Sequence, residues 1–228
     1  MTPIERLVTV DGPAGSGKST LGRRLALALH LPLIDTGLFY RGLTVAALRH
    51  GMSIDDLAGL VDLAQRTKLE LTTDPAASPD RGEVRVDGED GGPELRDPRH
   101  AALLTRISSI AEVRAAVLAP QRSLAADGAV AVGRDCGTVV FPRAPVKIYL
   151  QAPEAVRVRR RVRQLLGDAG ASGGATLTAE VHGRDRADSV RAVGPLRRAE
   201  DAHVIDTGQL SIAETLERAL ALCAAAGL

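Results

Sequence analysis

The stretch that most constrains the fold is LVTVDGPAGSGKSTLGRRLALAL, residues 7–29. An apolar run from Leu7 to Val10 predicts a buried strand, and the pattern from Leu21 to Leu29 predicts an amphipathic helix. The glycine-rich turn between them matches G-x-x-x-x-G-K-[ST], a loop whose backbone N–H groups surround phosphate. A strand, a phosphate loop and a helix in this order predict an α/β domain that binds a nucleoside triphosphate.

Each part of this loop has its own chemical task. The glycines let the backbone approach the β-phosphate without a Cβ in the way. Lys18 would place a charge on the β- and γ-phosphates, the helix would point its positive end at them, and the Ser19 hydroxyl would ligate Mg²⁺. The residues predicted to bind the triphosphate are Gly12, Pro13, Ala14, Gly15, Ser16, Gly17, Lys18, Ser19 and Thr20.

Strand and helix patterns alternate along most of the chain. Further strands are predicted at Leu33–Asp35, Ala129–Val132, Val146–Leu150 and His203–Asp206. Helices are predicted at about Leu38–Arg49, Arg99–Ser109, Glu112–Ala126, Glu154–Leu166 and Ser211–Ala226. The alternation predicts one α/β domain over residues 1–228, with a parallel five-stranded sheet flanked by helices. Residues 68–96 break the rhythm, because KLEL and EVRV alternate around Pro, Gly and Asp; they predict a small antiparallel β insert.

Composition argues against several classes of protein. A net charge of +1 and only 2% aromatic residues argue against nucleic-acid binding. The two cysteines, Cys136 and Cys223, lie far apart, so neither a zinc site nor a disulfide framework is indicated. The N-terminal residues contain no apolar run long enough for a signal peptide or a membrane span. We therefore expect a soluble cytoplasmic protein.

Two other classes that use the phosphate loop lose support as well. A GTPase should carry an Asn-Lys-x-Asp element, and the chain contains no Asn. An ATP-driven motor should show an apolar strand that ends in Asp-Glu, and none of the predicted strands does.

The second predicted strand runs into DTGLFYRG, residues 35–42. This stretch resembles the phosphate-acceptor element of nucleoside monophosphate kinases. The resemblance implies that Arg41 grips the acceptor monophosphate, with Asp35 beside it. A guanidinium suits this task because it can bind a phosphate through two parallel hydrogen bonds.

Three further stretches resemble the bacterial cytidylate kinases. They are GEDGGPELR (88–96), GRDCGTVVFPRAPVKIYL (133–150) and RDRADSVRAVGPL (184–196), and the resemblance covers nearly the whole chain. It implies a P-loop kinase fold in which the insert belongs to the nucleoside monophosphate region. It also implies phosphoryl transfer from ATP, with Mg²⁺, to CMP or dCMP. We expect a monomer with no nucleic-acid or membrane partner.

The same resemblance assigns the residues that bind CMP. In TRISSIAEVR, Thr105 takes the place of a family serine, Arg114 matches the arginine that contacts the base, and Ala111 replaces a usual proline. Arg134 is expected near the acceptor phosphate and Asp135 near the base. The predicted CMP-binding residues are Asp35, Arg41, Thr105, Arg114, Arg134, Asp135, Arg184, Asp188 and Arg191.

The spacing of Arg184, Asp188 and Arg191 would place all three on one helical face. The resemblance implies that Asp188 contacts ribose hydroxyls and that the arginines lie beside the phosphate and the base. Ala187 stands where relatives often have another arginine, so a transition-state role at that position is lost.

A basic run, RVRRRVR, covers residues 157–163 and precedes the Gly-, Ala- and Ser-rich stretch 167–176. A solvated basic helix face accounts for most of its arginines. The arrangement nevertheless resembles the lid of nucleotide kinases, here 157–176. Arg157, Arg160 and Arg161 match the lid arginines and, with Lys18, are the predicted catalytic residues.

Two alternatives stay open at this stage. The first is a P-loop kinase for another small acceptor, such as UMP, AMP or shikimate. The second is a regulatory or nucleic-acid-binding protein that depends on a nucleoside triphosphate, which the charge balance and the scarce aromatic residues disfavour. The sequence does not distinguish CMP from dCMP.

Overall fold

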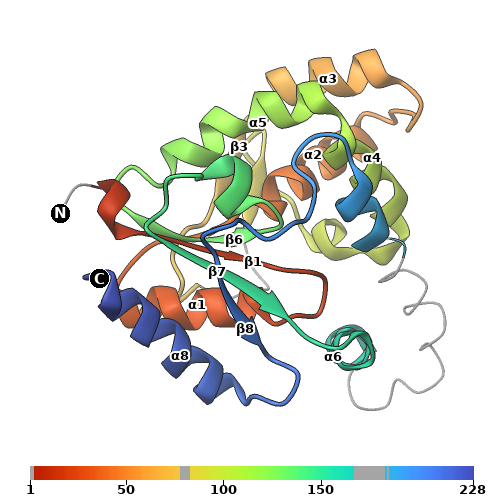
Figure 1. Cartoon of the computed structure of the whole chain (residues 1–228). Coiled ribbons are helices and arrows are strands. Elements are labelled where there is room, and N and C mark those ends of the chain that lie inside the picture. The colour runs from red at the N-terminus through yellow and green to blue at the C-terminus, as the bar shows by residue number, and fades with distance from the viewer. Residues whose placement is uncertain (1–2, 78–82, 167–182, 184) are drawn as a thin grey trace.

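The computed structural model describes residues 3–77, 83–166, 183 and 185–228. Its central sheet has five parallel strands in the order β2-β6-β1-β7-β8 (Figure 1). The strands are β1 (Leu7–Asp11), β2 (Leu33–Asp35), β6 (Ala129–Gly133), β7 (Val146–Gln151) and β8 (His203–Asp206). The predicted parallel sheet flanked by helices is confirmed.

Strands β1 and β6 form the centre of the sheet. Every residue of both strands is buried, as expected for parallel strands covered on two faces. They pair in register, with Val10 opposite Val132 and Asp11 opposite Gly133. The phosphate loop and the segment from Gly133 therefore leave neighbouring strands at the same level.

Helices α1 (Lys18–Leu29) and α8 (Ile212–Ala225) cover one face of this sheet (Figure 1). Helix α1 begins three residues before its apolar pattern, because the end of the phosphate loop already forms its first turn. Gly22 faces β6, where a Cβ would collide with the Val132 side chain, so α1 lies close to the sheet. A capping box between Ser211 and Glu214 starts α8.

The opposite face is covered by η4 (Cys136–Val140), a π-helical turn, and by α5 (Ala111–Ser123). Ile34, Ala131, Val140 and Phe141 belong to one buried cluster on this side. Side chains of β2 and β6 therefore pack in the same cluster as the end of η4.

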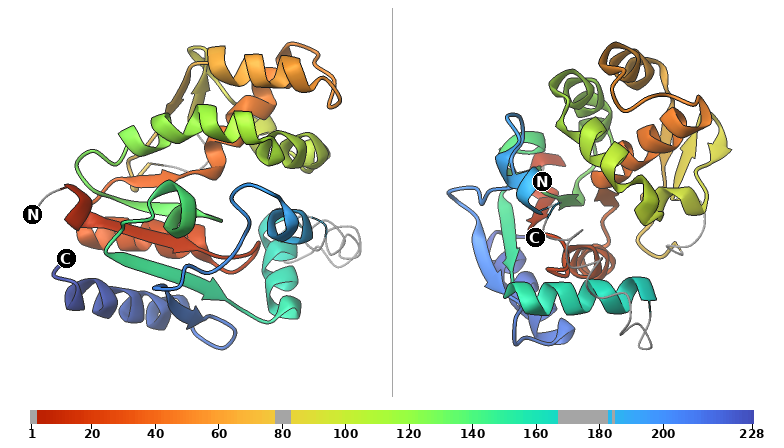
Figure 2. Two further views of the ribbon diagram at one scale, coloured as in Figure 1. Left: turned by 45° about the horizontal axis from the view of Figure 1, so that its top comes forward. Right: turned by 90° about the vertical axis from the view of Figure 1, so that its right-hand side faces the viewer.

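A second core joins the helices that follow β2 to the small antiparallel sheet. The elements are α2 (Gly37–Arg49), α3 (Leu57–Arg66), β3 (Leu69–Leu71), β4 (Val84–Val86), β5 (Glu89–Asp90), η2 (Pro93–Arg96), η3 (Pro98–His100) and α4 (Ala101–Ser109). Leu43, Leu60, Val84 and Ile107 are buried among them. Figure 2 (right) shows these elements gathered together, with α6 on the opposite side of the view. The predicted antiparallel β insert is confirmed.

Helix α6 (Glu154–Leu166) follows β7 with the predicted bounds, and residues 185–190 form a short helix. Residues 167–176 of the expected lid lie outside the described residues. A short turn, η1 (Pro3–Arg6), precedes β1. Among the described helices, none combines the length and the apolar character that crossing a bilayer requires.

Candidate active site

One cavity of about 590 Å³ lies at the carboxyl ends of the strands, where ligands bind in open α/β sheets. Its walls come from the phosphate loop, the start of α2, the segment after β6, α6 and residues 188–215. The predicted residues that line it are Ala14, Gly15, Ser16, Gly17, Lys18, Ser19, Thr20, Asp35, Arg41, Arg134, Asp135, Arg160, Arg161, Asp188 and Arg191.

Five predicted residues that the structure describes lie outside the cavity lining. They are Gly12, Pro13, Thr105, Arg114 and Arg157. Arg184 lies outside the described residues.

The phosphate loop depends on glycine at two positions. Gly15 has a φ of 72°, and a Cβ there would collide with the backbone carbonyl of Arg157. Gly12 has a φ of 155°, and a Cβ there would lie 2.5 Å from the carbonyl oxygen of Leu150. Strand β7 and helix α6 therefore press directly on the loop.

Three carbonyl oxygens of the loop accept hydrogen bonds, one from the loop's own lysine and two from side chains elsewhere in the chain. Lys18 Nζ donates to the Pro13 oxygen at 3.1 Å, and Arg157 Nη1 donates to the Ala14 oxygen at 3.0 Å. The Thr207 hydroxyl donates to the Ser16 oxygen at 3.0 Å. Each such bond holds a carbonyl in place and so fixes the peptide that carries it.

The arginines of α6 divide into two groups. Arg157 is 9% exposed and binds the loop, whereas Arg160 and Arg161 line the cavity. Arg160 donates to the hydroxyl and the carbonyl of Thr207, at 2.9 and 2.6 Å. Arg163 also lines the cavity. Arg163 was not among the predicted site residues, although it belongs to the same basic run.

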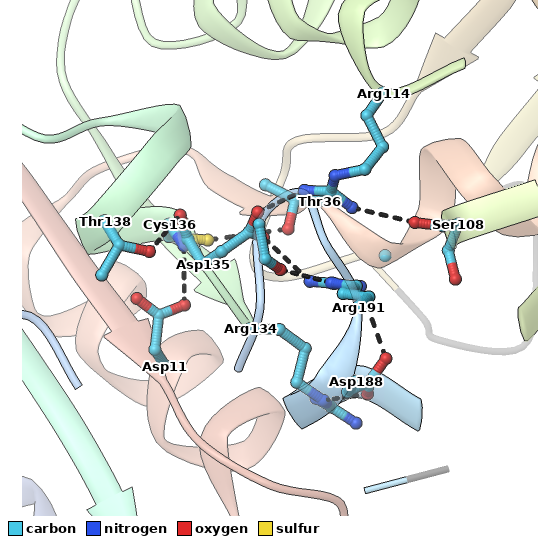
Figure 3. Close-up of polar contacts among 12 residues, drawn as sticks. Asp11, Thr36, Ser108, Arg114, Arg134, Asp135, Cys136, Thr138, Asp188 and Arg191 are labelled. Atoms are coloured by element: carbon cyan, nitrogen blue, oxygen red, sulfur yellow. Dashed lines mark hydrogen bonds and ion pairs between the residues drawn. The ribbon is translucent and has the colours of Figure 1, made fainter. Parts of the chain in front are cut away.

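The same cavity is bordered by a network of arginines and carboxylates that are largely shielded from solvent (Figure 3). Asp135 is paired with Arg114, and its other oxygen lies 3.6 Å from Arg191. Asp188 accepts from Arg134 at 2.9 Å and lies 3.4 Å from Arg191. Three guanidinium groups thus share two carboxylates, which leaves a surplus positive charge beside the cavity.

Arg114 is 5% exposed and lies behind Asp135 as seen from the cavity. Its guanidinium stacks 5.3 Å from the Tyr40 ring centroid and donates to the Ser108 carbonyl at 3.2 Å. Burial raises the pKa of the Asp135 carboxyl, and the Arg114 and Arg191 guanidinium groups oppose that rise. Burial lowers the pKa of Arg191.

Asp11, at the end of β1, ties this network to the phosphate loop. Its carboxylate accepts from the backbone N–H groups of Cys136 and Gly137, at 2.8 and 2.7 Å (Figure 3). Burial raises the pKa of Asp11 to about 6, although both hydrogen bonds oppose the rise. The turn that carries Arg134 and Asp135 is therefore anchored by the residue that precedes the loop.

Near the start of α2, Arg41 donates to the Leu95 carbonyl at 2.6 Å. Arg96 lines the same cavity and forms a fork with Glu83, at 2.7 and 3.1 Å. Thr36 lines it too, and its hydroxyl donates to the Val132 carbonyl at 3.0 Å. Arg96 and Thr36 were not among the predicted site residues, although both belong to stretches that resemble nucleotide kinases.

In α4 the cavity is lined by Leu104 and Ser108. The hydroxyl of Thr105 donates to the Ala101 carbonyl at 2.8 Å, within the helix. The predicted base contact of Thr105 stays a prediction, and within α4 the hydroxyl residue that lines the cavity is Ser108.

A phosphate loop and an arginine-rich wall in one cavity define a P-loop phosphotransferase. The chain matches the family model described as cytidylate kinase over residues 8–225. The cytidylate kinase of Rhodococcus jostii (strain RHA1) is 40% identical over 222 residues, which cover 96% of this chain and 95% of that one. The cytidylate kinase of Vibrio cholerae serotype O1 is 42% identical over 220 residues, with coverage of 96% and 95%. The chain belongs to the cytidylate kinase family.

Proposed function

We propose that the protein transfers the γ-phosphoryl group of ATP to CMP or dCMP, giving ADP and CDP or dCDP. The observation that carries this proposal is that the phosphate loop and members of the arginine–carboxylate network line one and the same cavity. The relatives named as cytidylate kinases support the choice of acceptor.

The donor phosphates fit the loop side of the cavity. Gly17 precedes α1 and has no side chain, so the first N–H groups of the helix can face a phosphate. Lys18 lies in the same wall and would move from the Pro13 carbonyl to the β- and γ-phosphates.

The donor set suits Mg²⁺. This ion is usually bound by one or two protein oxygens together with substrate phosphates and water. Ser19 and Asp35 offer a hydroxyl and a carboxylate in the same cavity, and Ser19 is our proposed ligand. When bound, the ion would neutralise charge between the β- and γ-phosphates.

The acceptor phosphate fits the arginine side. Arg41, Arg134 and Arg191 line this part of the cavity, and the surplus positive charge there favours a dianion. We propose that Asp188 binds the ribose and that Asp135 meets the base, supported by Arg114.

The transfer itself needs little covalent chemistry from the protein. The attacking group is a phosphate oxygen that is already anionic, so no strong general base is required. Positioning, charge neutralisation and exclusion of water supply the catalysis. We propose that Lys18, Arg160 and Arg161 stabilise the charge of the transferring group.

A carboxylate explains a preference for cytosine. The 4-amino group of cytosine donates a hydrogen bond, whereas uracil presents a carbonyl at that position. Asp135 can accept from the amine but repels the carbonyl.

An acceptor panel tests the proposal. The purified protein, ATP and Mg²⁺ are combined with CMP, dCMP, UMP, AMP or shikimate, and ADP release is followed with a coupled assay. We expect CMP and dCMP to have the highest kcat/KM, and their ratio will settle the sugar preference. A higher kcat/KM for any of the other three acceptors would contradict the proposal.

We further propose that the protein acts in the cytoplasm as a monomer on these small molecules. The near balance of charges, +1 overall, supports the absence of a nucleic-acid partner. Light scattering at micromolar concentration should give the mass of one chain, and a dimer mass would contradict this part of the proposal.

A further inference from the structure

The peptide groups of Ala14, in the middle of the phosphate loop, are held from both sides by one ion pair. The Ala14 N–H donates to Asp185 Oδ1 at 2.9 Å, and the Ala14 carbonyl accepts from Arg157 Nη1 at 3.0 Å. The same Nη1 also binds Asp185 Oδ2. The two charged side chains are 11% and 17% exposed, so their hydrogen bonds are largely shielded from water.

Arg157 is well fixed for this task. Its Nε donates to the Ala152 carbonyl at 3.3 Å, and its backbone carbonyl lies where a Cβ on Gly15 would be. Helix α6 therefore contacts the loop with both backbone and side chain. Asp185 binds the N–H group of the same residue, Ala14, from a position 171 residues away in sequence.

The pairing of Asp185 with Arg157 is also compatible with a phosphate loop that must bind a polyanion. A lone carboxylate at the loop would repel the donor phosphates, and Arg157 cancels that charge. A charge-assisted hydrogen bond is about twice as strong as a neutral one, so the two bonds to Ala14 restrict its rotation. The phosphate loop then keeps its shape before the nucleotide arrives.

We propose that Arg157 and Asp185 are positioning residues for the ATP phosphates, acting through the two peptide groups that flank the Ala14 Cα. Neither residue lines the cavity, so neither contacts the acceptor or the transferring group. Arg157 thereby differs from Arg160 and Arg161, which do line it. The inference rests on the proposed function only in naming ATP as the nucleotide that the loop holds.

A neighbouring carboxylate on the same short helix provides a contrast. Asp188 lies one turn after Asp185, and it binds Arg134 and Arg191 in the acceptor network. Two aspartates three residues apart are thus assigned to different substrates. Their variants should change different Michaelis constants.

The test compares Asp185→Asn with Asp188→Asn. Asp185→Asn should raise the KM for ATP and the Kd for ADP by about tenfold or more, because a charged hydrogen-bond partner is lost. Its KM for CMP should stay within about twofold of the wild-type value. Asp188→Asn should instead raise the KM for CMP and leave the KM for ATP and the Kd for ADP near their wild-type values. Arg159→Gln is the matched control, because Arg159 is an exposed arginine of α6, the helix of Arg157, and lies outside the cavity lining; it should change neither constant.

Arg157→Lys is the second variant. It keeps the charge, but one ammonium does not reproduce the geometry of the guanidinium, so the Kd for ADP should again rise. Because both residues hold Ala14 and are also paired with each other, the double variant Arg157→Lys/Asp185→Asn should bind ADP no more weakly than the weaker-binding single variant.

Several results would overturn this inference. They are an unchanged Kd for ADP in Asp185→Asn, a KM for CMP that rises as much as the KM for ATP, and a fall in kcat alone. Multiplying effects in the double variant would also contradict it. If circular dichroism shows that Asp185→Asn is unfolded, the ADP titration of Arg157→Lys decides. A wild-type protein that binds ADP but fails to phosphorylate CMP would refute the proposed function and leave this titration valid.

Discussion

Replacing Asp135 with asparagine would remove a negative charge from between Arg114, which is buried, and Arg191, which is half-buried, while keeping the side-chain shape. Asp135 is 4% exposed, and it is paired with Arg114 and lies 3.6 Å from Arg191. The change therefore tests both the stability of the network and its proposed contact with the base.

The expected loss of unfolding free energy depends on the interactions that Arg114 and Arg191 would retain in the variant. Removing one partner of a buried ion pair costs about 3–5 kcal/mol. Arg191 would retain Asp188 at 3.4 Å, and Arg114 would retain the Ser108 carbonyl at 3.2 Å and the Tyr40 ring. We therefore expect the lower end, about 3 kcal/mol of unfolding free energy. That loss corresponds to a fall in Tm of roughly 6–12 °C for a chain of this size.

Activity should change in a base-dependent way. The asparagine amide can donate to the uracil carbonyl, so the preference for CMP over UMP should narrow. A discriminating polar contact is worth about 1–3 kcal/mol, so the ratio of the two kcat/KM values should fall roughly tenfold or more.

Urea unfolding and steady-state kinetics with CMP and UMP would measure both effects. Asp62→Asn is the matched control, because Asp62 pairs with Arg66 on an exposed helix surface; it should change neither quantity measurably. An equal loss for CMP and UMP would limit Asp135 to a structural role. An unchanged unfolding free energy would refute the electrostatic reasoning itself.

Three further predictions concern the phosphate loop and its surroundings. Lys18→Ala should lower kcat by a factor equivalent to about 3–4 kcal/mol with the fold intact by circular dichroism, and near-normal turnover would contradict its role. Arg41→Ala should raise the KM for CMP far more than the KM for ATP, and equal rises would place Arg41 at both substrates. The pKa of Asp11 is raised from 3.8 to about 6, so the folded protein holds this proton more tightly than the unfolded chain does. The protonated carboxyl therefore stabilises the folded state at low pH, and this stabilisation is lost as pH rises through about 6. Lowering the pH from 7 to 5 should therefore stabilise the wild type by about 1 kcal/mol relative to Asp11→Asn, as measured by urea unfolding, and a difference of the opposite sign would refute it.

Most of the fold could be predicted because its elements are strongly periodic and lie beside glycine-rich turns. The five strands were found to within a residue at either end, and α6 had the predicted bounds. Helix α3 was missed, although Asp56 caps it and Leu60, Leu63 and Ala64 form its buried side. Its short amphipathic pattern lies between the predicted helix at 38–49 and the predicted β insert at 68–96, and it was not identified as a separate helix.

The candidate site was less predictable where a role depends on tertiary contacts. A basic run places several arginines on α6, but the sequence does not say which one meets the phosphate loop. Arg157 turns to the loop because the helix backbone packs on Gly15, and Arg160 reaches Thr207 instead. In α4, likewise, the pattern identified Thr105, whereas Ser108 lies one turn further along and lines the cavity.

The pairing of β1 with β6 has a consequence for how the chain tolerates change. The phosphate loop and the segment with Arg134 start at Asp11 and Gly133, which are partners in register. Their origins are therefore separated by one strand spacing, about 4.8 Å, that the hydrogen bonds between the strands keep constant. Inserting one residue into either strand would shift one loop by about 3.3 Å and turn its side chains to the other face. Length changes in the β3–β4–β5 sheet would leave that spacing untouched, so natural variation in length is expected there and not in β1 or β6.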